Sequence, residues 1–184
     1  LIGIVDAVRA EQKNATYVFG ATRSTAEFDR DECASYAIIA LGDIADPRAT
    51  DSLIAELARR RTSPTGSALG SLRDPRAIPA LFVALPHDMN ESVQTGLQLF
   101  GRDVLGPARG ALTNADPAVR AHTVRFLSTN ALFAAPADAA PLLADAAPSV
   151  RAEAADALGR FKGVPLATWL LPRLQDTAPE VRLA

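Results

Sequence analysis

Two histidines and one cysteine are the side chains in this sequence best suited to metal or nucleophilic chemistry. His87 and His122 stand far apart, and no His-Glu dipeptide occurs. Cys33 is the single cysteine, so no disulfide can form within the chain and no zinc site can be built from cysteines. A nucleophilic cysteine needs a base and a group that orients the base, and no motif supplies them. We therefore predict no catalytic residue, no metal ligand and no cofactor, with His87 exposed, His122 on a helix surface and Cys33 buried.

The composition is that of a folded helical protein. Hydrophobic residues make up 48 %, aromatic residues 5 %, and the formal net charge is −2. Disordered segments combine low hydrophobicity with high net charge, and neither property is present. The small net charge creates no strong field toward nucleic acid or anionic membranes, and no apolar run approaches the roughly 18 residues of a membrane helix. Abundant alanine favours closely packed helices, and we expect a cytoplasmic protein.

The sequence segments that would position these side chains recur along the chain. Residues 40–57 and 68–85 are identical at nine of eighteen aligned positions, 28 residues apart. A Leu-Gly pair closes a helical pattern at residues 41–42, 69–70 and 158–159. The sequence Pro-x-Val-Arg recurs with a period of 31 from Pro117, Pro148 and Pro179. Periods of this length are typical of stacked repeat units.

Each unit reads as two helices, because apolar residues recur at helical spacing on both sides of a short turn. The predicted pairs are 26–41 with 48–59, 64–69 with a helix that buries Ile78, Leu81, Phe82 and Leu85, 90–100 with 104–112, 117–128 with 137–144, and 148–159 with a helix that buries Leu166, Leu170 and Leu174. A repeat unit cannot bury its apolar face alone. We therefore interpret 26–184 as a repeat domain cut within a sixth unit, and 1–25 as an N-terminal helix and irregular connection from a preceding repeat.

Two motifs carry a resemblance to a known family. These are Gly-Asp-x-x-Asp-Pro-Arg-Ala at residues 42–49 and Pro-x-Val-Arg-x-x-Ala-x-x-Ala-Leu-Gly at residues 148–159. With them the chain resembles the HEAT-repeat family, in its short bacterial, phycocyanobilin-lyase-like type. The resemblance implies an all-α, right-handed α-α superhelix of about five helix pairs, whose second helices line the concave side. Similar proteins include scaffolds, chaperone-like subunits, chromophore lyase subunits and a few enzymes; the iron-binding type with His-Glu pairs is excluded.

The marker residues have a structural interpretation. An aspartate before proline can cap a helix start, as predicted for Asp46, Asp74 and Asp116, and Gly159 is predicted to cap a helix end in the left-handed conformation. One arginine recurs per unit. The series is Arg48, Arg76, Arg120, Arg151 and Arg182. It predicts a ladder of hydrogen bonds to carboxylates or carbonyls of neighbouring units, and an arginine-lined binding face is the alternative.

Candidate binding residues lie in two units. Trp169 aligns with Ser52, and Arg173 aligns with Glu56, on second helices. An exposed tryptophan is a plausible partner anchor, although it can equally cover the next unit, and Pro172 should kink or delay its helix. The possible partner-binding residues are Trp169, Arg173, Ser52, Glu56, Arg59, Arg60 and Arg61. The three consecutive arginines end a helix, where the helix dipole favours cations; a basic contact spot is the alternative.

These patterns favour a non-catalytic protein–protein interaction or assembly module that uses its concave surface. Its partner would be another protein, and its oligomeric state is left open. The alternative is a chromophore-lyase-like subunit associated with an enzyme. Nucleic-acid binding comes third, because successive units should then be basic, whereas the later units are neutral or acidic.

Overall fold

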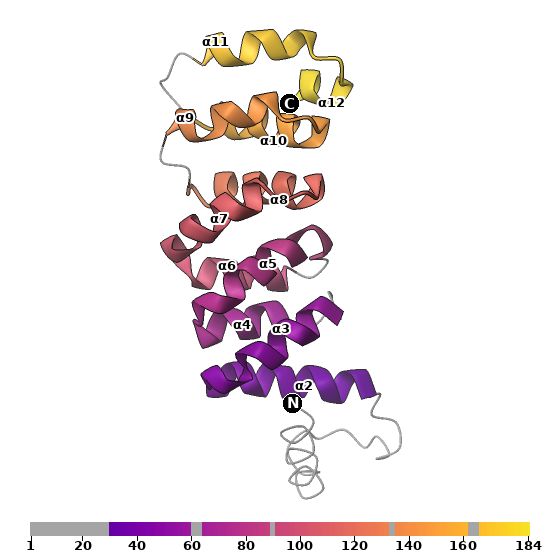
Figure 1. The fold of residues 1–184 in the computed structure, drawn as a ribbon, viewed down its shortest axis with the longest axis vertical. Helices are drawn as coiled ribbons and strands as arrows, with labels where there is room; N and C mark the ends of the chain where they lie inside the picture. Colours follow the sequence, from indigo (N-terminus) through magenta and orange to yellow (C-terminus); the bar gives the residue numbers. More distant parts are fainter. Residues whose placement is uncertain (1–29, 60–63, 89–90, 133–134, 162–165) are drawn as a thin grey trace, which may run out of the picture.

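The computed structural model describes residues 30–59, 64–88, 91–132, 135–161 and 166–184, which form a linear stack of helices with no strand among them. Figure 1 shows the helices lying one above another along the long axis, from α2 at the N-terminal end to α11 and α12 at the other. The predicted all-α helical-repeat fold is confirmed, and the handedness of the superhelix stays a prediction. No helix in these ranges is long and apolar enough to cross a membrane.

Each repeat unit is a first helix followed by a second helical element. The first helices are α2 (Arg30–Ile44), α4 (Thr65–Leu72), α6 (Ser92–Leu99), α8 (Pro117–Thr129), α10 (Pro148–Gly159) and α12 (Pro179–Leu183). The second elements are α3 (Thr50–Arg59), α5 (Ile78–Ala84), α7 (Leu105–Leu112), α9 (Pro136–Ala139) and α11 (Ala167–Leu170). Short 3-10 turns adjoin the second elements: η1 (Pro47–Ala49), η2 (Pro75–Ala77), η3 (Leu85–His87), η4 (Gly101–Val104), η5 (Ala140–Ala144) and η6 (Leu171–Gln175). The predicted segment 1–25 lies outside the described residues.

The Leu-Gly marker does not end its helix by a glycine cap, so that prediction is wrong. Helix α2 continues past Gly42 to Ile44, and the left-handed residue after it is Ala45, with φ of 53°. Helix α4 continues past Gly70 to Leu72, and Arg73 is left-handed with φ of 52°. After Gly159, the C-cap residue of α10 has right-handed φ and ψ angles.

The glycines of the first helices instead permit close packing. A Cβ on Gly70 would lie 2.6 Å from the Cα of Gly96, and one on Gly42 would lie 2.9 Å from the Cα of Ala68. A Cβ on Gly66 would meet the backbone of Val93 at 2.6 Å. Real Cβ atoms essentially never approach other atoms so closely, so only glycine permits these contacts. We call Gly42, Gly66, Gly70 and Gly96, which join α2, α4 and α6, the glycine seam.

The predicted aspartate caps are present. Asp46 Oδ1 accepts the backbone N–H of Arg48 at 2.9 Å, and Asp74 Oδ1 accepts that of Arg76 at 3.0 Å. Asp116 Oδ1 accepts the backbone N–H of Ala118 at 2.8 Å. The first two caps start the turns η1 and η2, and the third starts α8. Each cap satisfies a backbone donor that has no partner within its own helix.

Four of the five marker arginines form two groups rather than one series, and the fifth, Arg182, donates to the backbone carbonyl of Asp176 at 2.7 Å. Arg48 and Arg76 lie in η1 and η2 and fold back onto the capping aspartates two residues earlier. Arg120 and Arg151, in the first turns of α8 and α10, reach the next unit: Nη2 of each donates at 2.7 Å to Asp145 and Asp176, respectively. The aspartate is 25 residues further on each time, and the predicted ladder is therefore present in this part of the stack. We call the two pairs Arg120–Asp145 and Arg151–Asp176 the arginine ladder.

The buried side chains form two clusters that meet at α8. One runs from Ile38 to Leu127 and the other from Ala121 to Leu158. Phe126 of α8 belongs to the first cluster and packs edge-on against Phe82 of α5, with 5.9 Å between the ring centroids. The core positions predicted in the segments that form α5, η3 and α10 are buried: Ile78, Leu81, Phe82, Leu85, Val150, Ala154, Ala157 and Leu158.

The second helix of the last pair differs from the prediction. Helix α11 ends at Leu170, and the chain continues as the 3-10 turn η6 around Pro172, as expected for a proline that removes a helical hydrogen bond. Leu166 and Leu170 are only half-buried, and Leu174 is 62 % exposed rather than buried. Its counterpart Leu143 is 6 % exposed because it packs in the second cluster with residues of α10, whereas the corresponding helix α12 contains only Pro179–Leu183 here.

Candidate interaction surface

The exposed side of the second elements carries a recurring set of small, uncharged residues. Ala55 of α3, Val83 of α5 and Gly110 of α7 are exposed at spacings of 28 and 27 residues. Pro141 and Pro172 hold the corresponding exposed positions in η5 and η6, each a further 31 residues on. We call Ala55, Val83, Gly110, Pro141 and Pro172 the second-helix face. Val83 is the largest of them and is 50 % exposed.

Two observations suit this face to contact with another surface. Nothing lies within 4 Å of a Cβ built on Gly110, so a partner can approach the backbone there. Exposed charged side chains flank its small residues: Asp51 and Arg59 lie four residues before and after Ala55 on α3, and Arg109 precedes Gly110 on α7. Protein interfaces commonly combine such a charge-poor centre with a polar rim.

The binding candidates on α3 are mostly engaged within the helix. Glu56 is 6 % exposed, and its Oε2 accepts a hydrogen bond from Arg59 Nη2 at 2.8 Å. Ser52 is half-buried, and the Arg59 side chain is 69 % exposed. Arg60 and Arg61 lie outside the described residues. A partner-binding role for these residues stays a prediction.

Trp169 and Arg173 lie at the opposite end of the stack, on α11 and η6, so the structure does not bring the two candidate groups together (Figure 1). Trp169 is half-buried and packs against the second core cluster. Arg173 Nη1 donates to the backbone carbonyl of Leu143 at 2.9 Å and lies 3.8 Å from Asp176 Oδ2. Arg173 therefore connects the last pair to the unit before it, and the contact of Trp169 with the core cluster favours packing over anchoring.

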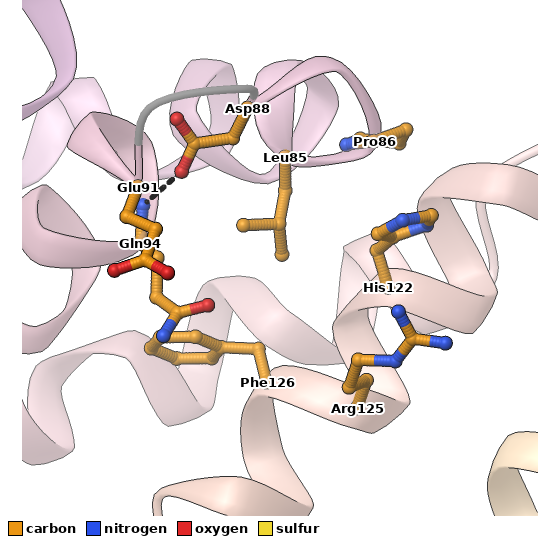
Figure 2. A pocket seen from close by; sticks show the side chains of 8 residues that line it. All are labelled: Leu85, Pro86, Asp88, Glu91, Gln94, His122, Arg125 and Phe126. Carbon is orange, nitrogen blue, oxygen red and sulfur yellow. Dashed lines mark hydrogen bonds between the residues drawn. The ribbon is translucent and has the colours of Figure 1, made fainter.

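A hollow of about 240 Å³ lies where η3, α6 and α8 meet. Figure 2 shows its lining: Leu85, Pro86, Asp88, Glu91, Gln94, His122, Arg125 and Phe126. Asp88, Glu91 and Gln94 lie on one side, and His122 and Arg125 of α8 lie on the other. We call this site the junction hollow, since one side of it is formed by α8, the helix at which the two core clusters meet.

Hydrogen bonds hold both sides of the junction hollow. Asp88 Oδ2 accepts the backbone N–H of Gln94 at 2.8 Å, which fixes the start of α6. His122 Nδ1 lies 2.9 Å from the carbonyl oxygen of Ala118; because a carbonyl oxygen only accepts, Nδ1 carries the proton. Arg125 donates to Glu153 of α10, and that hydrogen bond raises the pKa of the guanidinium. The one arginine in the lining is therefore already neutralised by a carboxylate.

The remaining chemistry-bearing residues form no centre. His87 is exposed, and it does not share a helical face with Glu91, which is four residues later, because η3 ends between them. Cys33 is free and half-buried, so the prediction that it is buried is wrong. Within the described ranges, no three His, Cys, Asp or Glu side chains are close enough to hold a metal ion.

Sequence reasoning missed the acidic side of the junction hollow. Asp88 and Glu91 follow the second unit, and no repeat marker accompanies them. Their place in the hollow depends on how η3, α6 and α8 pack together, which the repeat spacing does not predict. One signal was available. Asn114 stands where Asp145 and Asp176 stand in the next two units, at the same 31-residue period, so the carboxylate series is interrupted before α8.

Comparison with known families gives a match within the first described unit. The family model of the PBS lyase HEAT-like repeat matches residues 34–59, which cover most of α2 and all of α3. No curated protein matches the chain. The matched unit has the same order of first helix, Asp-Pro-Arg turn and second helix as the unit that follows it, so the match supports a HEAT-like repeat family for the chain.

Proposed function

We propose that this chain of HEAT-like repeats is a non-catalytic interaction module that holds another protein on its second-helix face. The observation that carries the proposal is the recurrence of small, uncharged, exposed residues on successive second elements. Repeat stacks present extended surfaces of this kind. A chain of such units can match the length of an elongated partner, since each unit adds one more contact position.

The pairing of the arginines argues against nucleic acid as the partner. Binding to phosphates needs clustered cations that are free to replace counterions. In the described ranges, eight arginines instead lie within 4.0 Å of a carboxylate: Arg48, Arg59, Arg76, Arg120, Arg125, Arg151, Arg160 and Arg173. These arginines are already paired with carboxylates of the same chain, and the chain has a net charge of −2.

A second candidate is an enzyme-associated subunit of a chromophore lyase, which the name of the matched repeat family suggests. The junction hollow gives this candidate little support, because about 240 Å³ is below the roughly 300–1,000 Å³ of small-molecule sites. If the chain acts in this way, a co-purified acceptor protein becomes covalently labelled and coloured when the chromophore is supplied. A scaffold leaves the acceptor colourless.

The proposal is tested by affinity capture of the chain in its native cell extract, with identification of the bound proteins. Val83→Glu places a charge at the centre of the second-helix face, and Ile39→Glu makes the same change on the first helix α2. The two positions are matched, at 50 % and 46 % exposure.

We expect Val83→Glu to lose a partner that the unchanged chain and Ile39→Glu both retain, with all three melting at similar temperatures. Capture of the same proteins by Val83→Glu would contradict the proposal.

A further inference from the structure

We propose that the junction hollow receives one basic side chain, lysine or arginine, from the partner protein. The inference rests on the proposed function, because it treats the hollow as a specificity site beside the second-helix face. The structure supplies three features that such a side chain requires: an apolar floor for its stem, carboxylates for its charged end, and a place in the stack that regular packing leaves open.

The apolar floor is formed by Leu85 and Phe126. Their side chains are 6 % and 2 % exposed, so they present a small, fixed surface at the bottom of the hollow. Figure 2 shows Leu85 between the acidic side and the α8 side, with Phe126 below them. Lysine and arginine carry an aliphatic stem that packs well on such a surface while the charged end stays near water.

The charge of the hollow favours a cation. Asp88 and Glu91 contribute two carboxylates, and Glu153 neutralises Arg125 on the opposite side. Asp88 uses Oδ2 to accept from Gln94, which leaves Oδ1 for a further donor. The lining is therefore rich in acceptors, which match the several N–H donors of a basic side chain.

The position of the hollow follows from a change in packing. Helix α4 packs tightly on α6, and α8 packs tightly on α10, but α8 meets the preceding units mainly through α7, η3 and α5. One side-chain hydrogen bond spans α6 and α8 at the surface, from Gln98 Nε2 to Asn130 Oδ1 at 3.0 Å. The helices α6 and α8 therefore pack less closely than the other neighbouring first helices, and the hollow lies beside them.

The test is a titration of the isotope-labelled chain with acetyl-arginine N-methylamide and acetyl-lysine N-methylamide, followed by the amide resonances of Glu91, Gln94 and His122. Acetyl-norleucine N-methylamide is the control probe, with a stem but no charge. We expect saturable shifts with a roughly millimolar dissociation constant for the basic probes, and no saturation with norleucine.

Two double variants make the test specific. Asp88→Asn with Glu91→Gln removes both charges yet retains an oxygen to accept from Gln94, and it should weaken the basic probes at least tenfold. Asp103→Asn with Glu180→Gln makes the same charge change at exposed sites on η4 and α12 and should leave binding unchanged.

Equal shifts with norleucine, or equal weakening in both double variants, would overturn the inference. So would concentration-dependent shifts of the same resonances without a probe, because a second copy of the chain would then be the occupant. Val83→Glu should bind the probes normally, so failure of the probes here and failure of partner capture remain separate results.

Discussion

The two ends of the stack join their repeats by different means. At the N-terminal end, α2, α4 and α6 approach so closely across the glycine seam that backbone meets backbone. At the C-terminal end, α8 and α10 reach the following units with the arginine ladder, whose side chains are 15 % exposed or less. One sequence period therefore supports two kinds of interface, and the residue at each repeated position decides which kind forms.

The N-terminal arginines show that an ion pair alone does not make a ladder. Arg76 contacts Asp51 of the preceding unit at 3.0 Å, but these side chains are 57 % and 79 % exposed. Exposed pairs of this kind add little to stability, because water screens them. The C-terminal pairs are sheltered, and Arg120 and Arg151 also donate through Nη1 to backbone carbonyls of the preceding turn.

The largest effect should come from adding one methyl group to the glycine seam. Gly70→Ala places a Cβ within 2.6 Å of two backbone atoms of Gly96. Neither backbone can move without shifting its helix, so we expect a loss of about 3 kcal/mol in the free energy of unfolding. Denaturant titration measures it.

Gly110→Ala is the matched control. A Cβ on Gly110 meets nothing within 4 Å, and the residue lies inside α7. Because alanine favours a helix over glycine, this variant should gain about 0.5–1 kcal/mol. If Gly70→Ala is as stable as Gly110→Ala, the seam is not a close contact.

A smaller loss should follow removal of a ladder arginine. Arg120→Met keeps much of the side-chain volume but removes the bonds to Asp145 and to the carbonyl of Asn114. We expect a loss of about 2 kcal/mol, as is typical for hydrogen bonds to charged groups. The control is Arg125→Met, which removes a pair from the same helix α8 to Glu153 of α10, with the arginine side chain 59 % exposed. It should cost less than about 1 kcal/mol, and equal losses for the two variants would contradict a special role for the ladder.

The smallest expected effect is a loss of folding stability at low pH. The hydrogen bond from Arg151 lowers the pKa of Asp176 to about 2, against about 3.9 in an unfolded chain. Between these values the unfolded chain binds more protons, so this contribution to stability is complete above about pH 5 and is lost as the pH falls toward 2.

Asp176→Asn should therefore flatten the dependence of stability on pH in that window, as measured by denaturant titrations at pH 2.5, 3.5 and 5. An unchanged slope would show that the Asp176 carboxylate titrates alike in both states.

The structural features that could be predicted from the sequence are those that recur in several units. Pro148 and its counterparts mark helix starts, Asp46 and Asp74 mark caps, and the spacing of Arg120 and Arg151 indicates a ladder. The glycine seam was misread because a glycine near the end of a helical pattern suits both a cap and a close contact. Only the position of the neighbouring helix separates the two.

The junction hollow was not predictable for a related reason. It exists because neither the glycine seam nor the arginine ladder joins α6 to α8. A repeat pattern in the sequence predicts the contacts that recur in every unit, and it does not predict a unit in which such a contact is missing. Leu174 gives the same lesson, since its exposure depends on how much of the next helix lies against it and not on its own spacing.

Hydrogen exchange of the backbone amides in Arg120→Met tests most directly whether the two ends are held independently. If they are, exchange becomes faster in α8 and α10 while α4 and α6 keep the protection of the unchanged chain, because each repeat depends on its immediate neighbours. An equal loss of protection in all four helices would mean that the stack opens as one unit, and the division into a glycine-joined end and an arginine-joined end would then carry no energetic meaning.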